Sequence, residues 1–267
     1  MSADLVKTEL RDNLYFVTLN RAEKRNAISI ALLTELADAV AGVDAYPGVR
    51  AVIVQAEGPI FSAGIDVMAL MGEKASAGEQ NPARWLRRLA ESLQHQLYRI
   101  EQTEVPVIGA CEGGVYGLGL EMAMAFDLIV AGEGCIFTLP ETRLGLVADV
   151  GGTTRLTKRV GPSRAKDMLM TARKVGAEEA LQWGLVNRIV PDGKAVEGAV
   201  TLAQEIAKNA PLAVGLAKYV VDHGDGVDRM TQMAIERLAQ SQLITAEDTT
   251  EALMSMMEKR DPEFKGR

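Results

Sequence analysis

Three carboxylates in the middle of the chain are the side chains best suited to acid–base chemistry. Glu121 follows a glycine-rich segment, Glu141 follows Pro140, and Asp149 lies in the apolar, glycine-rich run 147–152. Burial among apolar neighbours raises the pKa of a carboxyl group toward neutrality, where proton exchange is efficient. Each acid also has a simpler possible role. Glu121 could stabilise a helix N-terminus, Glu141 could be a solvated acid in a turn, and Asp149 could cap a helix. Together, the three acids favour a proton-transfer site.

Two glycine-containing turns, residues 61–66 and 113–119, each follow an apolar strand and precede a helix. Their small residues let a ligand approach the backbone closely, and N–H groups at a helix start can be free. If each turn gave one N–H group, the two would form an oxyanion hole for charge that develops on a thioester oxygen. Each turn taken alone could be only a tight connection, and neither matches a phosphate-binding motif.

The elements around these residues indicate an α/β fold. The hydrophobic pattern predicts a hairpin of 5–10 with 14–19, turning at Asp12-Asn13, and a mobile surface loop over 71–82. The pattern strand, glycine turn, helix occurs twice, at 52–66 and 107–121, which indicates a repeated structural unit. Further strands are expected at 51–54, 105–111, 127–131 and 186–190, and helices at 30–43, 83–101, 120–125, 163–171 and 177–183. From Lys194 onward the chain is expected to be helical, with breaks at Pro211 and 224–226.

The composition excludes several functional classes. The 267 residues are 48% hydrophobic and 24% charged, with a net charge of -7, so a nucleic acid or an anionic membrane is not expected as the main partner. Cys111 and Cys135 form no metal motif or disulfide framework. His95 and His223 fit no serine–histidine–acid or zinc spacing, so no metal is expected. Without a signal sequence or an apolar run of about 20 residues, we expect a cytoplasmic protein.

The order and spacing of several motifs resemble the crotonase superfamily, also called enoyl-CoA hydratase/isomerase, over nearly the whole chain. The matching segments are 20–27, similar to the family's coenzyme A loop, the turn 61–66, the segment 117–121, Pro140-Glu141, 151–156, 184–186 and the ending 258–264. The resemblance implies a spiral of ββα units over residues 1–200. It also implies a C-terminal helical oligomerisation region over 201–267, usually in homotrimers or hexamers.

The resemblance also implies an acyl-CoA thioester as substrate, with coenzyme A as part of that substrate and no separate cofactor. It places Glu121 and Glu141 at the two acid/base positions of enoyl-CoA hydratases. The backbone N–H groups of Ala63 and Leu118 would form the oxyanion hole. Residues expected to bind coenzyme A or substrate are Lys24, Ala27, Ser62, Ala63, Gly64, Ile65, Asp66, Gly117 and Leu118.

Two departures keep alternatives open. Asp149 stands where hydratases usually have glycine and dienoyl-CoA isomerases have aspartate, although those isomerases carry aspartate at position 121. Leu118 replaces the middle one of three glycines and is expected to narrow the acyl pocket. Hydration of a trans-2-enoyl-CoA is therefore the leading hypothesis. The alternatives are double-bond migration through Glu141 and Asp149, and a non-catalytic acyl-CoA-binding protein.

Overall fold

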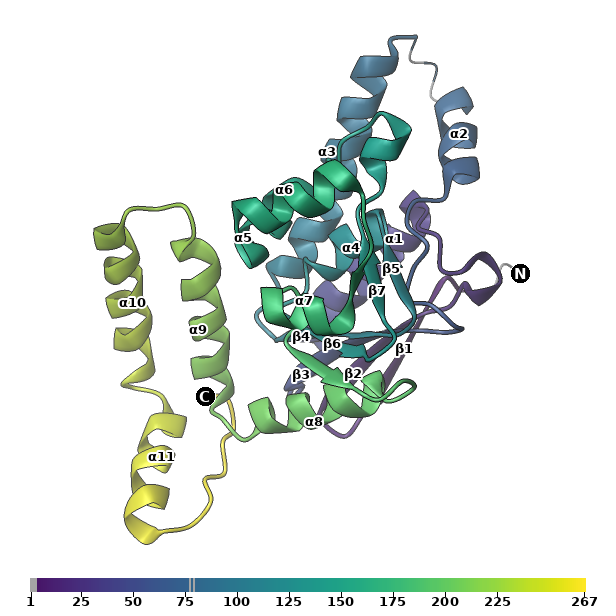
Figure 1. Cartoon of the computed structure of the whole chain (residues 1–267). Helices are drawn as coiled ribbons and strands as arrows, with labels where there is room; N and C mark the ends of the chain where they lie inside the picture. The colour runs from purple at the N-terminus through teal and green to yellow at the C-terminus, as the bar shows by residue number, and fades with distance from the viewer. Residues whose placement is uncertain (1–3, 77, 79) are drawn as a thin grey trace.

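A six-stranded sheet forms the centre of the computed structural model, which describes residues 4–76, 78 and 80–267 (Figure 1). The first two strands form the predicted antiparallel hairpin, with Asp12 in the turn at a φ of 53°. Every other neighbouring pair in this sheet is parallel. The strands in spatial order are β1 (Val6–Arg11), β2 (Leu14–Leu19), β3 (Ala51–Ala56), β4 (Val107–Cys111), β6 (Leu128–Gly132) and β9 (Arg188–Val190).

A second, smaller sheet runs beside the first and creates the spiral. It contains β5 (Gly114–Tyr116), β7 (Ile136–Thr138) and β8 (Val175–Gly176), and an isolated bridge joins Ser62 to Val115 of β5. The chain therefore passes from the large sheet to the small sheet and into a helix repeatedly, as β4, β5 and α4 (Leu118–Ala123) show. This arrangement confirms the predicted ββα spiral.

Helices cover both faces of the large sheet. On one face, α1 (Ile30–Ala41) buries Leu32, Leu33 and Leu36 and packs against α3 (Pro82–Glu101). The Ser29 hydroxyl caps α1 by accepting from the Leu32 amide. The opposite face is covered by α8 (Ala195–Ala207), which contacts β3, β4 and β6. The remaining helices of this part are α2 (Val67–Ser76), α5 (Gly152–Val160), α6 (Pro162–Thr171) and α7 (Ala177–Trp183), with 3-10 turns η1 (Ala22–Lys24), η2 (Gly42–Ala45) and η3 (Glu141–Leu144).

Three C-terminal helices project from this core as an arm, which we define as residues 211–267. It contains α9 (Pro211–Gly224), α10 (Arg229–Leu243) and α11 (Glu247–Glu258), and the chain then returns toward the start of α9 (Figure 1). The buried Asp248 carboxylate fixes the return by accepting from the amides of Lys265 and Gly266. The arm leaves large apolar side chains exposed: Tyr219, Val221, Val227, Met230, Met233, Leu238, Ile244, Leu253, Met254, Met256 and Met257.

Two local predictions differ from the structure, and the simpler role offered for Asp149 is excluded. Residues 71–76 continue helix α2 instead of forming a loop. Residues 77 and 79, which belong to the same predicted loop of 71–82, lie outside the described part of the chain. The segment 112–119 is not a plain turn, because it contains β5. Asp149 does not cap α5, whose N-cap is Gly151. No helix within the described residues combines the length and the hydropathy that a membrane span requires.

Candidate active site

The two glycine turns lie side by side. The Ser62 amide donates to the carbonyl of Gly114 at 3.1 Å, and the Tyr116 amide donates to the carbonyl of Ser62 at 3.0 Å. Ile65 of the first turn and Leu118 of the second line one small cavity together with Ile28 and Leu93. The sequence therefore predicted correctly that these two bends face one space.

The backbone N–H groups of Ile65 and Leu118 have no hydrogen-bond partner among the described residues, and neither has that of Gly119, the second residue of α4. The residues flanking Ile65 pair with Ile28, because the Ile28 amide donates to the carbonyl of Gly64 and the Asp66 amide donates to the carbonyl of Ile28. The Ile65 amide is left out of that bridge. Unpaired N–H groups at the entrance of a cavity are the donors that an oxyanion hole needs.

The predicted donor Ala63 is unsuitable in this structure. Its amide donates to the carbonyl of Arg25 at 2.9 Å, so the N–H group is already used to hold the 20–27 loop against the turn. Because one N–H group makes one good hydrogen bond, the free amide two residues later, at Ile65, takes its place as the candidate. The prediction for Leu118 is compatible with the structure, since its amide is free at the start of α4.

Close backbone approach requires glycine at one position in each turn. Gly64 has a φ of 92°, and a Cβ atom there would lie 2.8 Å from the Tyr116 carbonyl oxygen. Gly117 has a φ of 50°, and a Cβ atom there would lie 2.9 Å from an Oε atom of Glu141. Side chains at these positions would separate the two turns or displace the glutamate.

Glu121 is buried in α4 with a defined set of partners. Its Oε1 atom accepts hydrogen bonds of 2.8 Å from the amides of Val150 and Gly152. Burial raises the pKa of Glu121 to about 7, the Gly152 and Val150 amides oppose that rise, and the nearby charges of Glu141 and Asp149 add to it. A carboxyl group with a pKa near 7 can both give and take a proton at neutral pH.

Glu141 begins the 3-10 turn η3 and points its carboxylate at the second glycine turn. Its Oε2 atom is buried and has no hydrogen-bond partner among the described residues. Burial raises the pKa of Glu141 above its ordinary value, its own backbone amide opposes the rise, and the charge of Asp149 adds to it. An unpaired buried carboxylate oxygen is costly unless a ligand or water occupies the space beside it.

Asp149 is close enough to both glutamates to influence them, but it is exposed and not buried as the sequence suggested. Partial desolvation still raises its pKa, and its own backbone amide opposes that rise. Its carbonyl accepts from the Gln94 side chain. Asp149 also lines an open groove between α3 and α5, together with His95 and Tyr98.

Two residues expected to bind coenzyme A or substrate, Ser62 and Asp66, also fix the shape of the first turn, and their contact with a ligand stays a prediction. The Ser62 hydroxyl donates to the carbonyl of Asn26 at 2.8 Å and accepts from the Gly64 amide at 3.2 Å. Asp66 pairs with Arg21 at 2.7 Å, and its other carboxylate oxygen accepts from the Ala69 amide at the start of α2. The Ala69 bond and the Arg21 charge lower the pKa of Asp66 despite burial.

The 20–27 loop lies against this turn. Its Lys24 side chain is exposed near Asp66, and the Ala27 carbonyl accepts from Arg21 at 2.8 Å. Lys24 is therefore free to meet an anionic ligand, whereas Ala27 contributes through its position beside the turn. The contact of either residue with coenzyme A stays a prediction.

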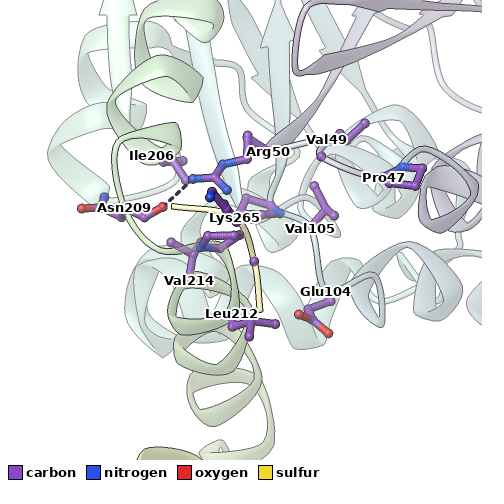
Figure 2. A pocket seen from close by; sticks show the side chains of 14 residues that line it. Pro47, Val49, Arg50, Glu104, Val105, Ile206, Asn209, Leu212, Val214 and Lys265 are labelled. Atoms are coloured by element: carbon purple, nitrogen blue, oxygen red, sulfur yellow. Dashed lines mark hydrogen bonds between the residues drawn. The ribbon is translucent and has the colours of Figure 1, made fainter. Parts of the chain in front are cut away.

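A separate cavity lies between the core and the arm, where Figure 2 shows Arg50 reaching toward Asn209. The Arg50 guanidinium donates to the carbonyls of Ala207 at 3.0 Å and Asn209 at 2.9 Å, and it thereby holds the end of α8. The lining residues include one acid, Glu104, and none of the three candidate catalytic carboxylates. Acid–base chemistry is therefore assigned to the two turns and not to this cavity.

No group of three or more histidine, cysteine or acidic side chains among the described residues is arranged to hold a metal ion. Cys111 and Cys135 are free and buried, and burial raises the pKa of each thiol, to about 12 for Cys135. Sequence reasoning missed the amides of Val150 and Gly152 as partners of Glu121. The glycine-rich run around them was a visible signal of close backbone approach.

Comparison with known proteins identifies the family of the chain. Residues 9–267 match the family described as Enoyl-CoA hydratase/isomerase. The chain belongs to the enoyl-CoA hydratase/isomerase family. It is 32% identical to the 2,3-dehydroadipyl-CoA hydratase of Escherichia coli (strain K12), with both chains covered completely. Identity is 35% to a probable mitochondrial enoyl-CoA hydratase 2 of Arabidopsis thaliana, over 94% of this chain and 81% of that protein.

The fold comparison gives the same family. A crystal structure of an enoyl-CoA hydratase from Bacillus anthracis superposes with a TM-score of 0.90 and 33% identity, covering 99% of this chain and 100% of that one. The expectation of a crotonase-type α/β spiral with C-terminal helices is confirmed for this family member. The chain is also 34% identical to carnitinyl-CoA dehydratase of Escherichia coli (strain K12), over 94% of both proteins.

Proposed function

We propose that this protein is an enoyl-CoA hydratase, which adds water across the double bond of trans-2-enoyl-CoA thioesters. The observation that carries the proposal is the pairing of the buried Glu121 and the half-buried Glu141 with unpaired amides at one site. The charge of Glu141 helps to raise the pKa of Glu121, and Glu141 Oε2 has no hydrogen-bond partner among the described residues. Relatives named as enoyl-CoA hydratases and as a 2,3-dehydroadipyl-CoA hydratase support the same reaction.

In the proposed mechanism, the Ile65 and Leu118 amides donate to the thioester oxygen and stabilise the enolate that forms there. Glu121 and Glu141 hold a water molecule between them. One glutamate, ionised, removes a proton from the water as the water oxygen bonds to the β-carbon, and the other glutamate, protonated, gives its proton to the α-carbon on the same face. The double-bond electrons form the new bond at the α-carbon, so the product is a 3-hydroxyacyl-CoA.

The test is an absorbance assay with crotonyl-CoA and longer enoyl-CoA substrates. Hydration removes the conjugated double bond, so its absorbance falls in the presence of the protein. Folded protein that binds acyl-CoA but leaves this absorbance unchanged at every chain length contradicts the proposal and supports the non-catalytic alternative.

A second candidate reaction, migration of a double bond in a dienoyl-CoA, is favoured by one observation. Asp149 lies within electrostatic range of both glutamates, so it can exchange a proton farther along the acyl chain. Replacing Asp149 by glycine should then abolish isomerisation and spare hydration. Isomerisation that survives this change excludes the role.

The arm of residues 211–267 supports a proposal about assembly. Eleven of its large apolar side chains are exposed on three consecutive helices and the turns between them, and exposed apolar surface of this kind favours a subunit contact. We infer that the protein assembles as a homotrimer or as a hexamer of two trimers. We also infer that it acts in the cytoplasm, with coenzyme A as part of the substrate and no separate cofactor. Light scattering at several protein concentrations measures the assembly, and a stable monomer contradicts it.

A further inference from the structure

The end of helix α4, which carries Glu121, is held by one partly buried cation. Arg159, on α5, donates from Nη2 to the carbonyl of Met124 at 3.2 Å and to the carbonyl of Phe126. These carbonyls directly follow α4, which has only six residues and carries Glu121. The C-terminal end of a helix carries partial negative charge, so a partly buried guanidinium that binds the carbonyls just beyond it stabilises this end.

Helix α5 therefore contacts α4 at two places, the Glu121 side chain within the helix and the residues that follow its C-terminus. At the start of α5, the Gly152 amide donates to the Glu121 carboxylate, and one residue before the end of α5, Arg159 binds the carbonyls beyond α4. A shift of α4 along its axis would lengthen both sets of hydrogen bonds. A helix of six residues has little rigidity of its own, so these contacts set where Glu121 lies.

The arm joins this arrangement through a partly buried ion pair. Lys218 of α9 contacts Asp127 at 2.8 Å, with side chains exposed to only 10% and 22%. The same Asp127 oxygen accepts from the Val107 amide at the start of β4, and Asp127 follows Phe126 directly. Charged groups that act on Arg159 are Asp127, Glu101, Arg155 and Asp222, and burial is the largest influence, lowering its pKa.

We propose that Arg159 is a positioning residue for Glu121, and that Lys218 of the arm supports it through Asp127. Arg159 touches none of the unpaired amides and none of the carboxylates, and it is absent from the charges that act on Glu121. Its effect on catalysis therefore passes through the position of α4. This inference rests on the proposed hydratase function of the Glu121 site and names what holds that site in place.

The experiment compares Arg159→Met and Arg159→Lys with the wild-type protein in the full chain. Because a displacement of about 1 Å can cost about a hundredfold in rate, we expect kcat with crotonyl-CoA to fall at least about tenfold in Arg159→Met, with KM within about twofold. Arg159→Lys should recover part of the loss. Lys166→Met, an equal charge change at an exposed position of the neighbouring helix α6, should behave as wild type.

A second readout separates positioning from simple stability. The Glu121 carboxyl carbon, assigned by comparison with Glu121→Gln, is titrated by ¹³C nuclear magnetic resonance. Weaker hydrogen bonds from Val150 and Gly152 would raise the pKa of Glu121 above about 7, against the unchanged charges of Glu141 and Asp149. Lys218→Met should also raise the pKa of Glu121, but by a smaller amount.

The outcomes are distinguishable. A wild-type protein without hydratase activity defeats the proposed function, yet the titration still tests the positioning role. An active wild-type protein, together with a folded Arg159→Met variant of unchanged kcat and unchanged Glu121 titration, overturns the inference. A variant that only melts at lower temperature, with the wild-type titration, also overturns it. If Arg159→Met does not fold, Arg159→Lys and Lys218→Met decide by the same two measurements.

Discussion

The carboxylate of Glu121 and the amide of Gly152 are joined by a hydrogen bond of 2.8 Å across 31 residues of sequence. Gly152 is the first residue of α5, so the positive end of that helix faces the carboxylate. The contact lowers the pKa of Glu121, while burial raises it more, and the balance is a value of about 7. The contact therefore keeps the pKa of the deeply buried Glu121 carboxyl group near neutral pH.

Burial of Glu121 gives the folded protein a stability that depends on pH. The group has a pKa of about 7 when folded and about 4.5 when unfolded, so between these values the folded state holds a proton that the unfolded state has lost. The free energy of unfolding therefore decreases as pH rises from 4.5 through 7, by up to about 3 kcal/mol from this residue. Glu121→Gln should remove that part of the decrease, measured by denaturant unfolding at pH 5 and pH 8.

Glu178→Gln is the matched control for this measurement, because Glu178 is exposed on α7. It should unfold with the pH dependence of the wild-type protein. Glu141 and Asp149, whose pKa values are also raised, retain their own contribution in the same direction. If the free energy of unfolding falls equally in Glu121→Gln and in the wild-type protein between pH 5 and pH 8, the pKa of Glu121 is not raised as described above.

Replacing either glutamate by glutamine should reduce hydration much more than substrate binding. A positioned acid or base contributes about 10²–10⁴-fold to rate, so kcat with crotonyl-CoA should fall by that order in Glu121→Gln and in Glu141→Gln, with a small change in KM. The glutamine oxygen at position 121 can still accept from the Val150 and Gly152 amides, which preserves the local fold. Steady-state kinetics of the two variants would contradict the shared role if either retained the wild-type kcat.

The sequence predicted the location of the site better than its atomic detail. The order of strand, glycine turn and helix placed the 61–66 and 113–119 turns together, because parallel strands bring equivalent connections to one edge of a sheet. It could not identify the free amide, since Ala63 and Ile65 differ only in their pairing with residues 25–28 far back in the chain. Exposure of Asp149 was equally hidden, because apolar neighbours in sequence do not fix which way a loop side chain faces.

Local composition also misled at two elements. Helix α2 was predicted as a loop over 71–76, because Gly72 and small polar residues weaken the helical pattern there. Strand β5 was predicted as a turn, since its three residues begin with Gly114 and become a strand only by pairing with β7. In both cases tertiary contacts, which one sequence does not display, overrode local preference.

Gly117 is expected to be essential for the position of Glu141. An alanine Cβ atom there would approach the Glu141 carboxylate to 2.9 Å at a φ of 50°, so Gly117→Ala should both displace the glutamate and cost about 1–3 kcal/mol of stability. The control is Gly193→Ala, at a φ of 78° with no atom within 4 Å of the new Cβ. Kinetics and denaturant unfolding should show that both variants lose stability and that only Gly117→Ala loses kcat. Equal kcat in the two variants would remove the steric argument.

The identity of the first oxyanion donor can be tested by replacing single amides with esters, which removes one N–H group and keeps the side chain. An ester at Ile65, introduced as the hydroxy-acid analogue of isoleucine, should reduce kcat about 10²–10³-fold. An ester at Ala63 removes the bond to the Arg25 carbonyl, so it should cost about 0.5–1.5 kcal/mol of stability with a smaller fall in kcat. The two variants are matched. Each ester also weakens the carbonyl of the preceding residue as an acceptor, Gly64 for the ester at Ile65 and Ser62 for the ester at Ala63, and both carbonyls accept a hydrogen bond from a backbone amide. The reverse order of kcat values would return the role to Ala63.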